Sequence, residues 1–228
     1  FRPVRCPLNG KQARGILSLG VSSLITEVSS GIVMLLFNQI LLSLSGNVGV
    51  AAYGIIANLA LIVVSIFTGV AQGIQPIVSR SFGSGQMRHV KQIFHYGVIT
   101  AAAFGLLFLG IGWFFSQPIV GIFNQENNLE MERLASQGLP LYFLAFPMMG
   151  VNILASSYLA SLSKGGPAFV LSVLRGAAAV IPAVLLLSRL FGITGVWLAV
   201  PCAEALTFLV FLAMLPFCFR RPQKGAGA

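Results

Sequence analysis

The chain has 228 residues, of which 57% are hydrophobic and only 8% are charged. Soluble domains carry about 25% charged residues, so this composition predicts an all-α, polytopic membrane protein and excludes an ordinary soluble domain. The formal net charge is +9, but the basic residues fall in short groups between apolar runs. That distribution is typical of cytoplasmic loops, so we expect a lipid bilayer and no nucleic acid as partner.

The N-terminal stretch 1–14 carries four cations and no acid. It is predicted to be a cytoplasmic linker that leads into the first membrane helix. Because the chain begins with Phe1 rather than Met and the first residues do not resemble a signal peptide, we interpret it as the C-terminal piece of a longer protein.

The first predicted membrane helix covers about 16–44 and contains one acid, Glu27. At 1.5 Å per residue from Gly15, Glu27 lies roughly 18 Å deep, near the bilayer midplane. A carboxylate at this depth costs about 2.5 kcal/mol or more unless it is protonated, paired or faces water. Asn38 shares the helix face of Glu27. We interpret Glu27 as a proton or cation site; the alternative is a protonated carboxyl group that hydrogen-bonds a neighbouring helix.

The second predicted membrane helix covers about 50–78 and carries a polar stripe. Asn58, Ser65 and Gln72 recur every seven residues and therefore share one helix face. A polar stripe in lipid must face protein or water, so it forms either a cavity wall or hydrogen bonds between helices. We expect a basic, glycine-containing loop at 80–92 to follow.

Four further membrane helices are predicted, and together with the first two they form a transmembrane lobe at 15–219. They cover about 93–115, 139–162, 168–189 and 196–219. A short surface helix is expected within 124–137, which holds three of the five acids. Asn152 is a further candidate for a cavity wall. Pro147 and Pro182 are expected to bend the fourth and fifth membrane helices, and 220–228 is predicted to be a cytoplasmic tail.

The distribution of lysine and arginine predicts the orientation. The N-terminal linker, the loops after the second and fourth membrane helices and the tail carry more Lys and Arg than the loops on the other side. This alternation predicts a multi-pass protein of the cell membrane with six spans and both termini in the cytoplasm.

No group of residues has the spacing of a catalytic or metal site, so we expect neither an enzyme nor a cofactor beyond a coupling ion. Two other charged residues lie deep in the predicted helices. Glu204 lies roughly 16 Å from Ile193, and Arg175 lies about 12 Å from the cytoplasmic side. If Arg175 paired with Glu27, that acid would be a poor proton carrier, whereas desolvation of Glu27 would raise its pKa. The sequence leaves both open.

Two stretches resemble a known family of transporters. Residues 70–94 (VAQGIQPIVSRSFGSGQMRHVKQIF) resemble the second helix and following loop of the C-terminal lobe in the multidrug and toxic compound extrusion (MATE) family. Residues 195–210 (GVWLAVPCAEALTFLV) resemble the last helix of that lobe. Glu27 matches the coupling-ion residue of the lobe's first helix. One branch of the family also has an Asp in the fourth helix, but 139–162 contains no acid.

The resemblance implies a twelve-helix transporter with two six-helix lobes. Such proteins export amphipathic, often cationic compounds in exchange for H⁺ or Na⁺. The resemblance therefore implies a small-molecule substrate, a partner in the N-terminal lobe of the same protein, and coupling through Glu27. Glu204 is a second candidate for coupling because of its depth in the predicted helix, and a structural role for it stays open. Two alternatives remain: a flippase for lipid-linked oligosaccharides, and a truncated membrane protein that does not transport.

Overall fold

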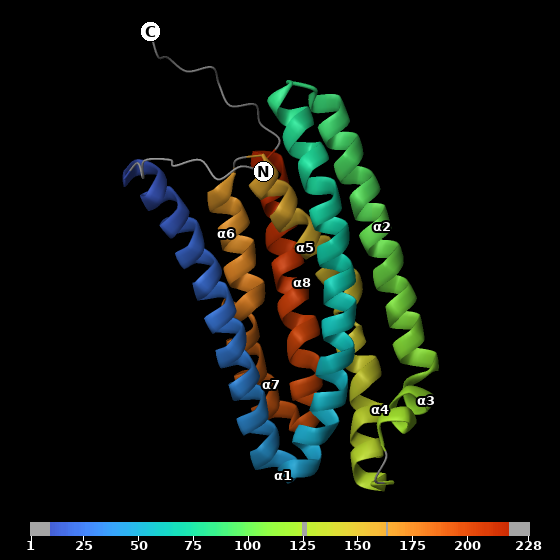
Figure 1. Ribbon diagram of the computed structural model, residues 1–228. Coiled ribbons are helices and arrows are strands. Elements are labelled where there is room, and N and C mark those ends of the chain that lie inside the picture. The colour runs from blue at the N-terminus through green and yellow to red at the C-terminus, as the bar shows by residue number, and fades with distance from the viewer. Residues whose placement is uncertain (1–9, 125–126, 163, 219–228) are drawn as a thin grey trace, which may run out of the picture.

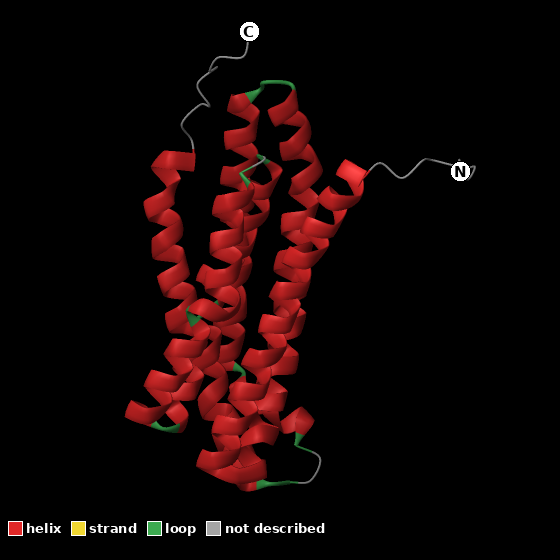
Figure 2. Cartoon of the chain, turned by 90° about the vertical axis from the view of Figure 1, so that its left-hand side faces the viewer, coloured by secondary structure: helices red, strands yellow, loops and turns green. Residues whose placement is uncertain are grey.

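A computed structural model of the chain describes residues 10–124, 127–162 and 164–218. For 10–27 and 216–218 it describes the path of the backbone but not the side chains. Every regular element in the described ranges is a helix, and the helices form one elongated bundle (Figures 1 and 2). The prediction of an all-α fold is therefore confirmed.

Helix α1 (Gly10–Gly83) is broken once and folds back on itself as two antiparallel arms (Figure 1). The break lies at Ser45, with φ −142° and ψ 15°, and at Gly46, with φ 62°. A positive φ favours glycine, which has no Cβ to clash with the backbone. The first arm, 10–44, and the second arm, 47–83, are antiparallel, as their short uncharged connection predicts.

The loop expected at 80–92 is much shorter in the structure. The second arm continues to Gly83, and α2 (Met87–Phe114) begins after three intervening residues. Gly85, with φ 77°, makes the turn between them. The predicted length of this loop was wrong, because helical hydrogen bonds continue through its charged residues. The side chains of these residues remain at the surface.

The short surface helix expected within 124–137 differs from the helices that the structure has in this region. Helix α3 (Ser116–Phe123) is short, and α4 (Leu129–Phe143) begins within 124–137 but continues past it. The carboxamide oxygen of Asn128 accepts hydrogen bonds from the backbone N–H groups of Glu130 and Met131, which caps α4. The prediction of a separate surface helix was wrong, because the charged residues belong to the first turns of a helix whose later turns are buried.

The fourth predicted membrane helix is bent in the structure. Helix α4 ends at Phe143, and α5 (Phe146–Ser161) begins after a bend of 48°. Pro147 lies in the first turn of α5, where its missing N–H removes no hydrogen bond. The bend therefore falls just before Pro147, in line with the expected effect of this proline.

The fifth predicted membrane helix contains a π-helical turn. It consists of α6 (Gly165–Val173), the π turn η1 (Leu174–Ala178) and α7 (Val180–Phe191), and α8 (Ile193–Cys218) follows. The backbone N–H of Ala179 donates to the oxygen of Leu174, five residues earlier. The irregularity lies at η1, just before the bend expected at Pro182.

Four helical stretches are long and apolar enough to cross a membrane, and the bent pair α4–α5 makes a fifth candidate. They are Val28–Gly83, Met87–Phe114, Gly165–Phe191 and Ile193–Leu215. The first of these contains the fold-back at Ser45 and Gly46 and so supplies both arms of α1. The six spans and their orientation remain predictions.

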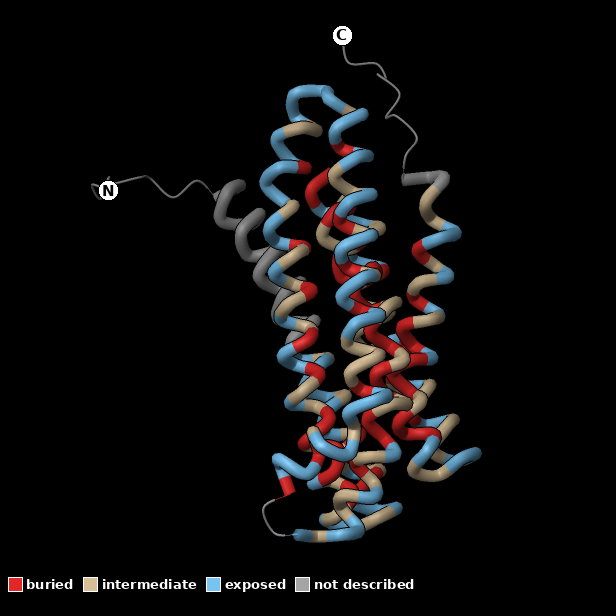
Figure 3. Tube along the Cα trace, turned by 90° about the vertical axis from the view of Figure 1, so that its right-hand side faces the viewer, coloured by how far each residue is buried: buried red, intermediate tan, exposed pale blue. Residues whose placement is uncertain are grey.

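The core lies where α5 packs against the other helices. Its buried side chains include Phe146, Asn152 and Leu154, while the outward faces of the surrounding helices remain exposed (Figure 3). At Gly105 of α2 the backbone of Pro147 approaches so closely that an added Cβ would lie 2.5 Å from its Cα atom. This close packing holds α5, and with it Asn152, in a fixed position inside the bundle.

Candidate functional site

A carboxylate, a guanidinium and an amide meet inside the lobe. Glu204 of α8 contacts both Arg175 of η1 and Asn152 of α5, so the cluster joins three different helices. Glu204 is only 2% exposed. A buried charge is costly unless it is paired and hydrogen-bonded, so the two neighbours explain how α8 tolerates this acid.

Asn152 holds Glu204 through two hydrogen bonds. Its Nδ2 atom donates to the backbone oxygen of Glu204 at 2.9 Å and to Oε2 of the same residue at 2.7 Å. Two acceptors on one side require the NH₂ group there, which sets the orientation of the amide. The Oδ1 atom of Asn152 is buried and has no hydrogen-bond partner.

Arg175 pairs with the other carboxylate oxygen. Its Nη2 atom lies 3.3 Å from Oε1 of Glu204, and its side chain is 24% exposed. The Nε atom of Arg175 is buried without an acceptor. The pair therefore uses one guanidinium nitrogen and leaves a second donor unsatisfied.

A cavity of about 310 Å³ opens beside this ion pair. Both arms of α1, the α4–α5 pair, η1 and α8 contribute to its lining. The rings of Phe37 and Tyr53 stack in its wall with centroids 5.2 Å apart, and Tyr142 lies nearby. Arg175 and Glu204 form its charged end. The cavity offers an apolar, aromatic wall and one carboxylate, a combination that suits a cation or an amphipathic molecule.

Glu27 lies on the first arm of α1, one turn before Ser30, which lines this cavity. Its side chain lies outside the part of the chain that the structure describes. The role predicted for Glu27, and its pairing with Arg175, therefore stay predictions. In the described part of the structure, the side chain of Arg175 contacts Glu204.

The other predicted cavity residues lie away from this cavity. Asn58 is exposed, and its Nδ2 donates to the oxygen of Gly54 in its own helix. Gln72 is also exposed and Asn38 is half-buried. The proposed wall formed by Asn58 and Gln72 thus lies on the outer surface of the lobe, and its role stays a prediction.

The cluster joins two residues that the sequence singled out separately. Glu204 was a candidate coupling residue and Asn152 a candidate cavity residue, but nothing in the sequence paired them. The available signal was that Asn152, Arg175 and Glu204 are polar residues at similar depth in three successive predicted membrane helices. Asn152 lies in the predicted helix in which one branch of the family named in the sequence analysis has an acid. In this chain Glu204 of α8 supplies a carboxylate next to Asn152.

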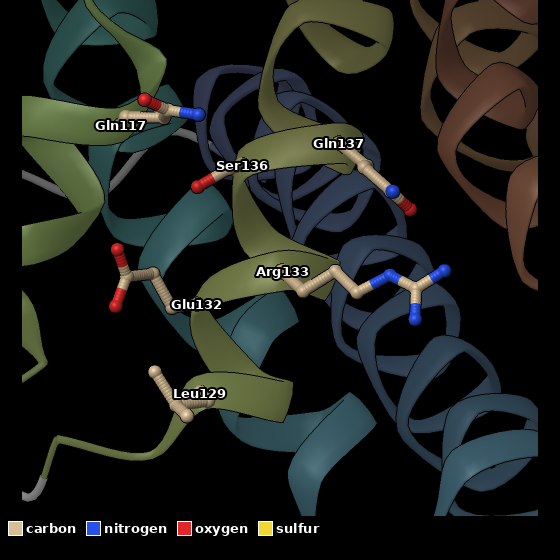
Figure 4. Close-up of a pocket in the computed structure, with 6 residues that line it drawn as sticks. All are labelled: Gln117, Leu129, Glu132, Arg133, Ser136 and Gln137. Carbon is tan, nitrogen blue, oxygen red and sulfur yellow. The ribbon is translucent and has the colours of Figure 1, made fainter.

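A second cavity, of about 300 Å³, lies where α3 meets α4 (Figure 4). Glu132 and Ser136 face the same side as Gln117, whereas Arg133 and Gln137 extend away from them. Oε2 of Glu132 accepts a hydrogen bond of 3.1 Å from Asn124. Glu132 is therefore already engaged in the structure of the α3–α4 connection.

The described residues contain no group of three or more His, Cys, Asp or Glu side chains that could hold a metal ion. The buried ion pair with its cavity is thus the arrangement with the clearest chemical capacity in this part of the chain. It can hold one positive charge against a fixed carboxylate.

Comparison with protein families decides the classification. The family model of MatE matches residues 20–185, most of the chain. The chain belongs to the MatE family. This match confirms the resemblance to multidrug and toxic compound extrusion proteins.

Curated relatives agree with this assignment to MatE. The multidrug export protein MepA of Staphylococcus aureus is 26% identical over 211 residues, which cover 91% of this chain and 45% of MepA. MepA of Staphylococcus haemolyticus is 26% identical over 199 residues, covering 87% of this chain and 42% of that protein. The chain thus spans less than half the length of these curated relatives.

Solved structures share the MatE fold. An outward-facing multidrug resistance MATE transporter has a TM-score of 0.83 at 15% identity, covering 93% of this chain and 48% of that one. The Vibrio cholerae MATE transporter VcmN in its bent form has a TM-score of 0.81 at 18% identity, covering 92% of this chain and 48% of that one. At these identities the likeness concerns the fold alone.

Proposed function

We propose that this MatE-family chain is the six-helix C-terminal lobe of an antiporter that exports amphipathic, often cationic compounds in exchange for H⁺ or Na⁺. The observation that carries the proposal is the carboxylate of Glu204, which is buried among helices and borders a cavity of about 310 Å³. Ionisable groups at such positions in membrane helices mark ion pathways. The printed names of the relatives, which describe multidrug export, support the choice of cargo.

The transport cycle would use the charge of this carboxylate. When Glu204 holds a cation or a proton, the charge balance around Arg175 differs from that of the free carboxylate. A ligand that binds one conformation better shifts the population toward it, so cation loading would bias the lobe between inward-open and outward-open states. Glu27 would supply a second carboxylate from the first arm of α1.

The partner would be an N-terminal lobe of the same protein. The relatives are about twice as long as the matched region, and the aromatic and polar faces of this lobe would then close a substrate path between two lobes. In the same proposal both termini face the cytoplasm and the six helices cross the cell membrane. The flippase alternative gains no support from relatives whose printed names describe multidrug export.

The test replaces one carboxyl group at a time in the full-length transporter. Glu204→Gln and Glu27→Gln keep the side-chain shape but remove the ionisable group, and Glu130→Gln is a matched control at the exposed start of α4. We expect Glu204→Gln and Glu27→Gln to abolish drug resistance in cells at unchanged membrane expression, while the control retains it. Full resistance in Glu204→Gln would refute the proposed role of this residue, and full resistance in Glu27→Gln would refute that of the other.

A further inference from the structure

The ion pair between Arg175 and Glu204 is incomplete. A guanidinium and a carboxylate usually form two parallel hydrogen bonds. Here a single pair of atoms approaches, Nη2 and Oε1 at 3.3 Å, and the buried Nε of Arg175 has no acceptor. A buried donor without a partner is destabilising. Arg175 therefore holds the carboxylate through less than its full bonding capacity.

Within this pair the carboxylate is the fixed member and the guanidinium is the movable one. Asn152 fastens Glu204 by both its backbone oxygen and Oε2, and Glu204 is 2% exposed. Arg175 has a longer side chain, is 24% exposed and borders the cavity. A displacement of Arg175 into the cavity leaves Glu204 in place.

The backbone conformation at Arg175 provides a way for its side chain to move into the cavity. Arg175 lies in η1, whose five residues form a π turn between two α-helices. Single π turns inside α-helices occur frequently at functional sites. A return of η1 to α-helical hydrogen bonding changes the register by one residue, about 100° of rotation around the helix axis. Such a change would carry the guanidinium away from Glu204.

The charged groups around the cavity balance when one positive charge, either that of Arg175 or that of a bound cation, lies beside the carboxylate of Glu204. Arg175 of η1 and Asn152 of α5 contact Glu204, while Tyr142 of α4 and Tyr53 of the second arm line the cavity that Glu204 borders. Arg175 is the positive charge among the described residues that line the cavity. When Arg175 leaves, a buried carboxylate is exposed to the cavity without a counter-charge, a state that strongly favours binding of a cation.

We propose that the guanidinium of Arg175 and the coupling cation occupy the carboxylate of Glu204 in turn, so that Arg175 is a tethered counter-cation that releases the transported cation. This inference rests on the proposed coupling role of Glu204. Arg175 acts through Glu204 and is a positioning residue. Its pairing with the carboxylate expels the cation, and cation binding requires that Arg175 moves into the cavity.

The test measures cation binding separately from transport. The full-length transporter is purified in detergent, and its thermal unfolding temperature is titrated with Na⁺ at fixed pH and with H⁺ in the absence of Na⁺. A ligand that binds the folded state raises this temperature, so each titration yields a midpoint for the cation. The variants are Arg175→Gln, Arg175→Lys and, as a matched control on the same predicted span, Arg189→Gln, whose side chain is exposed near the end of α7.

We expect Arg175→Gln to lower the midpoint concentration of the coupling cation at least about tenfold, because no guanidinium then competes with the cation for the carboxylate. In proteoliposomes the same variant should load cations but release them slowly, and so should exchange drug slowly. Arg175→Lys keeps the charge without the fork-shaped donor set, so it should shift the midpoint in the same direction by at least about threefold. Arg189→Gln should match the wild type.

The outcomes separate this inference from the function on which it rests. Arg175→Lys supplies the measurement if Arg175→Gln fails to fold. An unchanged midpoint in the folded Arg175 variants, with cation dependence lost in Glu204→Gln, would overturn the tethered counter-cation but leave the coupling role of Glu204 intact. Cation dependence that persists in Glu204→Gln would overturn both.

Discussion

Asn152 ties helix α5 to helix α8 by donating its amide to two oxygens of the same residue, Glu204. The hydrogen bonds are 2.9 Å to the backbone oxygen and 2.7 Å to Oε2. Because the backbone oxygen of a helix is spatially fixed, the second bond places the carboxylate at a defined position relative to α5. This arrangement directs the remaining carboxylate oxygen toward Arg175.

Asn152→Leu tests this connection, because leucine is similar in size but donates no hydrogen bond. A buried charged acceptor would lose its partner, which costs about 1–3 kcal/mol or more. We expect a lower unfolding temperature of the purified full-length protein and loss of drug export. Ser156→Ala on the same helix is the control, since its hydroxyl donates only to the backbone oxygen of Asn152. Equal effects of the two substitutions would contradict the special role of Asn152.

Gly105→Ala tests the close contact of α2 with α5. The added Cβ would lie 2.5 Å from Cα and 2.8 Å from N of Pro147, which are backbone atoms that cannot rotate away. Overpacking of this kind costs about 1–3 kcal/mol. We expect a lower unfolding temperature and reduced membrane expression. Gly110→Ala in the same helix meets no atom within 4 Å and should be neutral, so a similar loss in both variants would argue against this contact.

Asn128→Ala tests the cap of α4. The substitution removes the oxygen that accepts from the backbone N–H groups of Glu130 and Met131. Loss of such a cap costs about 1 kcal/mol, which thermal unfolding of the full-length protein measures. Asn128→Asp keeps an acceptor oxygen and should retain the wild-type stability. Equal stability of the alanine and aspartate variants would show that the cap does not stabilise α4.

Deletion of Ala177 tests the π turn. One residue fewer allows η1 to form an ordinary α-helix while α6 and α7 keep their relative register, so the deletion removes the π turn through which Arg175 would leave Glu204. We expect helical content by circular dichroism to be retained, but cation-driven drug exchange in proteoliposomes to be lost. Ala178→Ser keeps the length of the turn and serves as control. Normal exchange after the deletion would show that transport does not require the π turn.

Much of the fold was predictable because its determinants are local. Long apolar runs with few charges predict helices, and the short connection between the arms of α1 predicts their antiparallel arrangement. The errors arose where a helix continued through polar residues. The surface helix expected at 124–137 merges into α4, and the loop expected at 80–92 is largely helical. Charge indicates the end of an apolar segment, but helical hydrogen bonds do not stop there.

The bends were predictable only in part. Pro147 follows the 48° bend between α4 and α5, as a proline within a long helix indicates. The π turn at 174–178 precedes Pro182 and has no signature of its own in the sequence. Its position decides which way Arg175 faces, and neighbouring helices rather than local preference select it.

The sequence by itself determined that the chain is an all-helical membrane protein, because hydrophobicity and helical periodicity act over neighbouring residues. The MatE type was indicated separately, by the resemblance of residues 70–94 and 195–210 to that family. The sequence also identified Glu204 as an acid that must be accommodated deep in the protein. Only the tertiary structure decided its partners. Arg175 is 29 residues away in the chain and Asn152 is 52 residues away, and contacts over such separations depend on how whole helices pack.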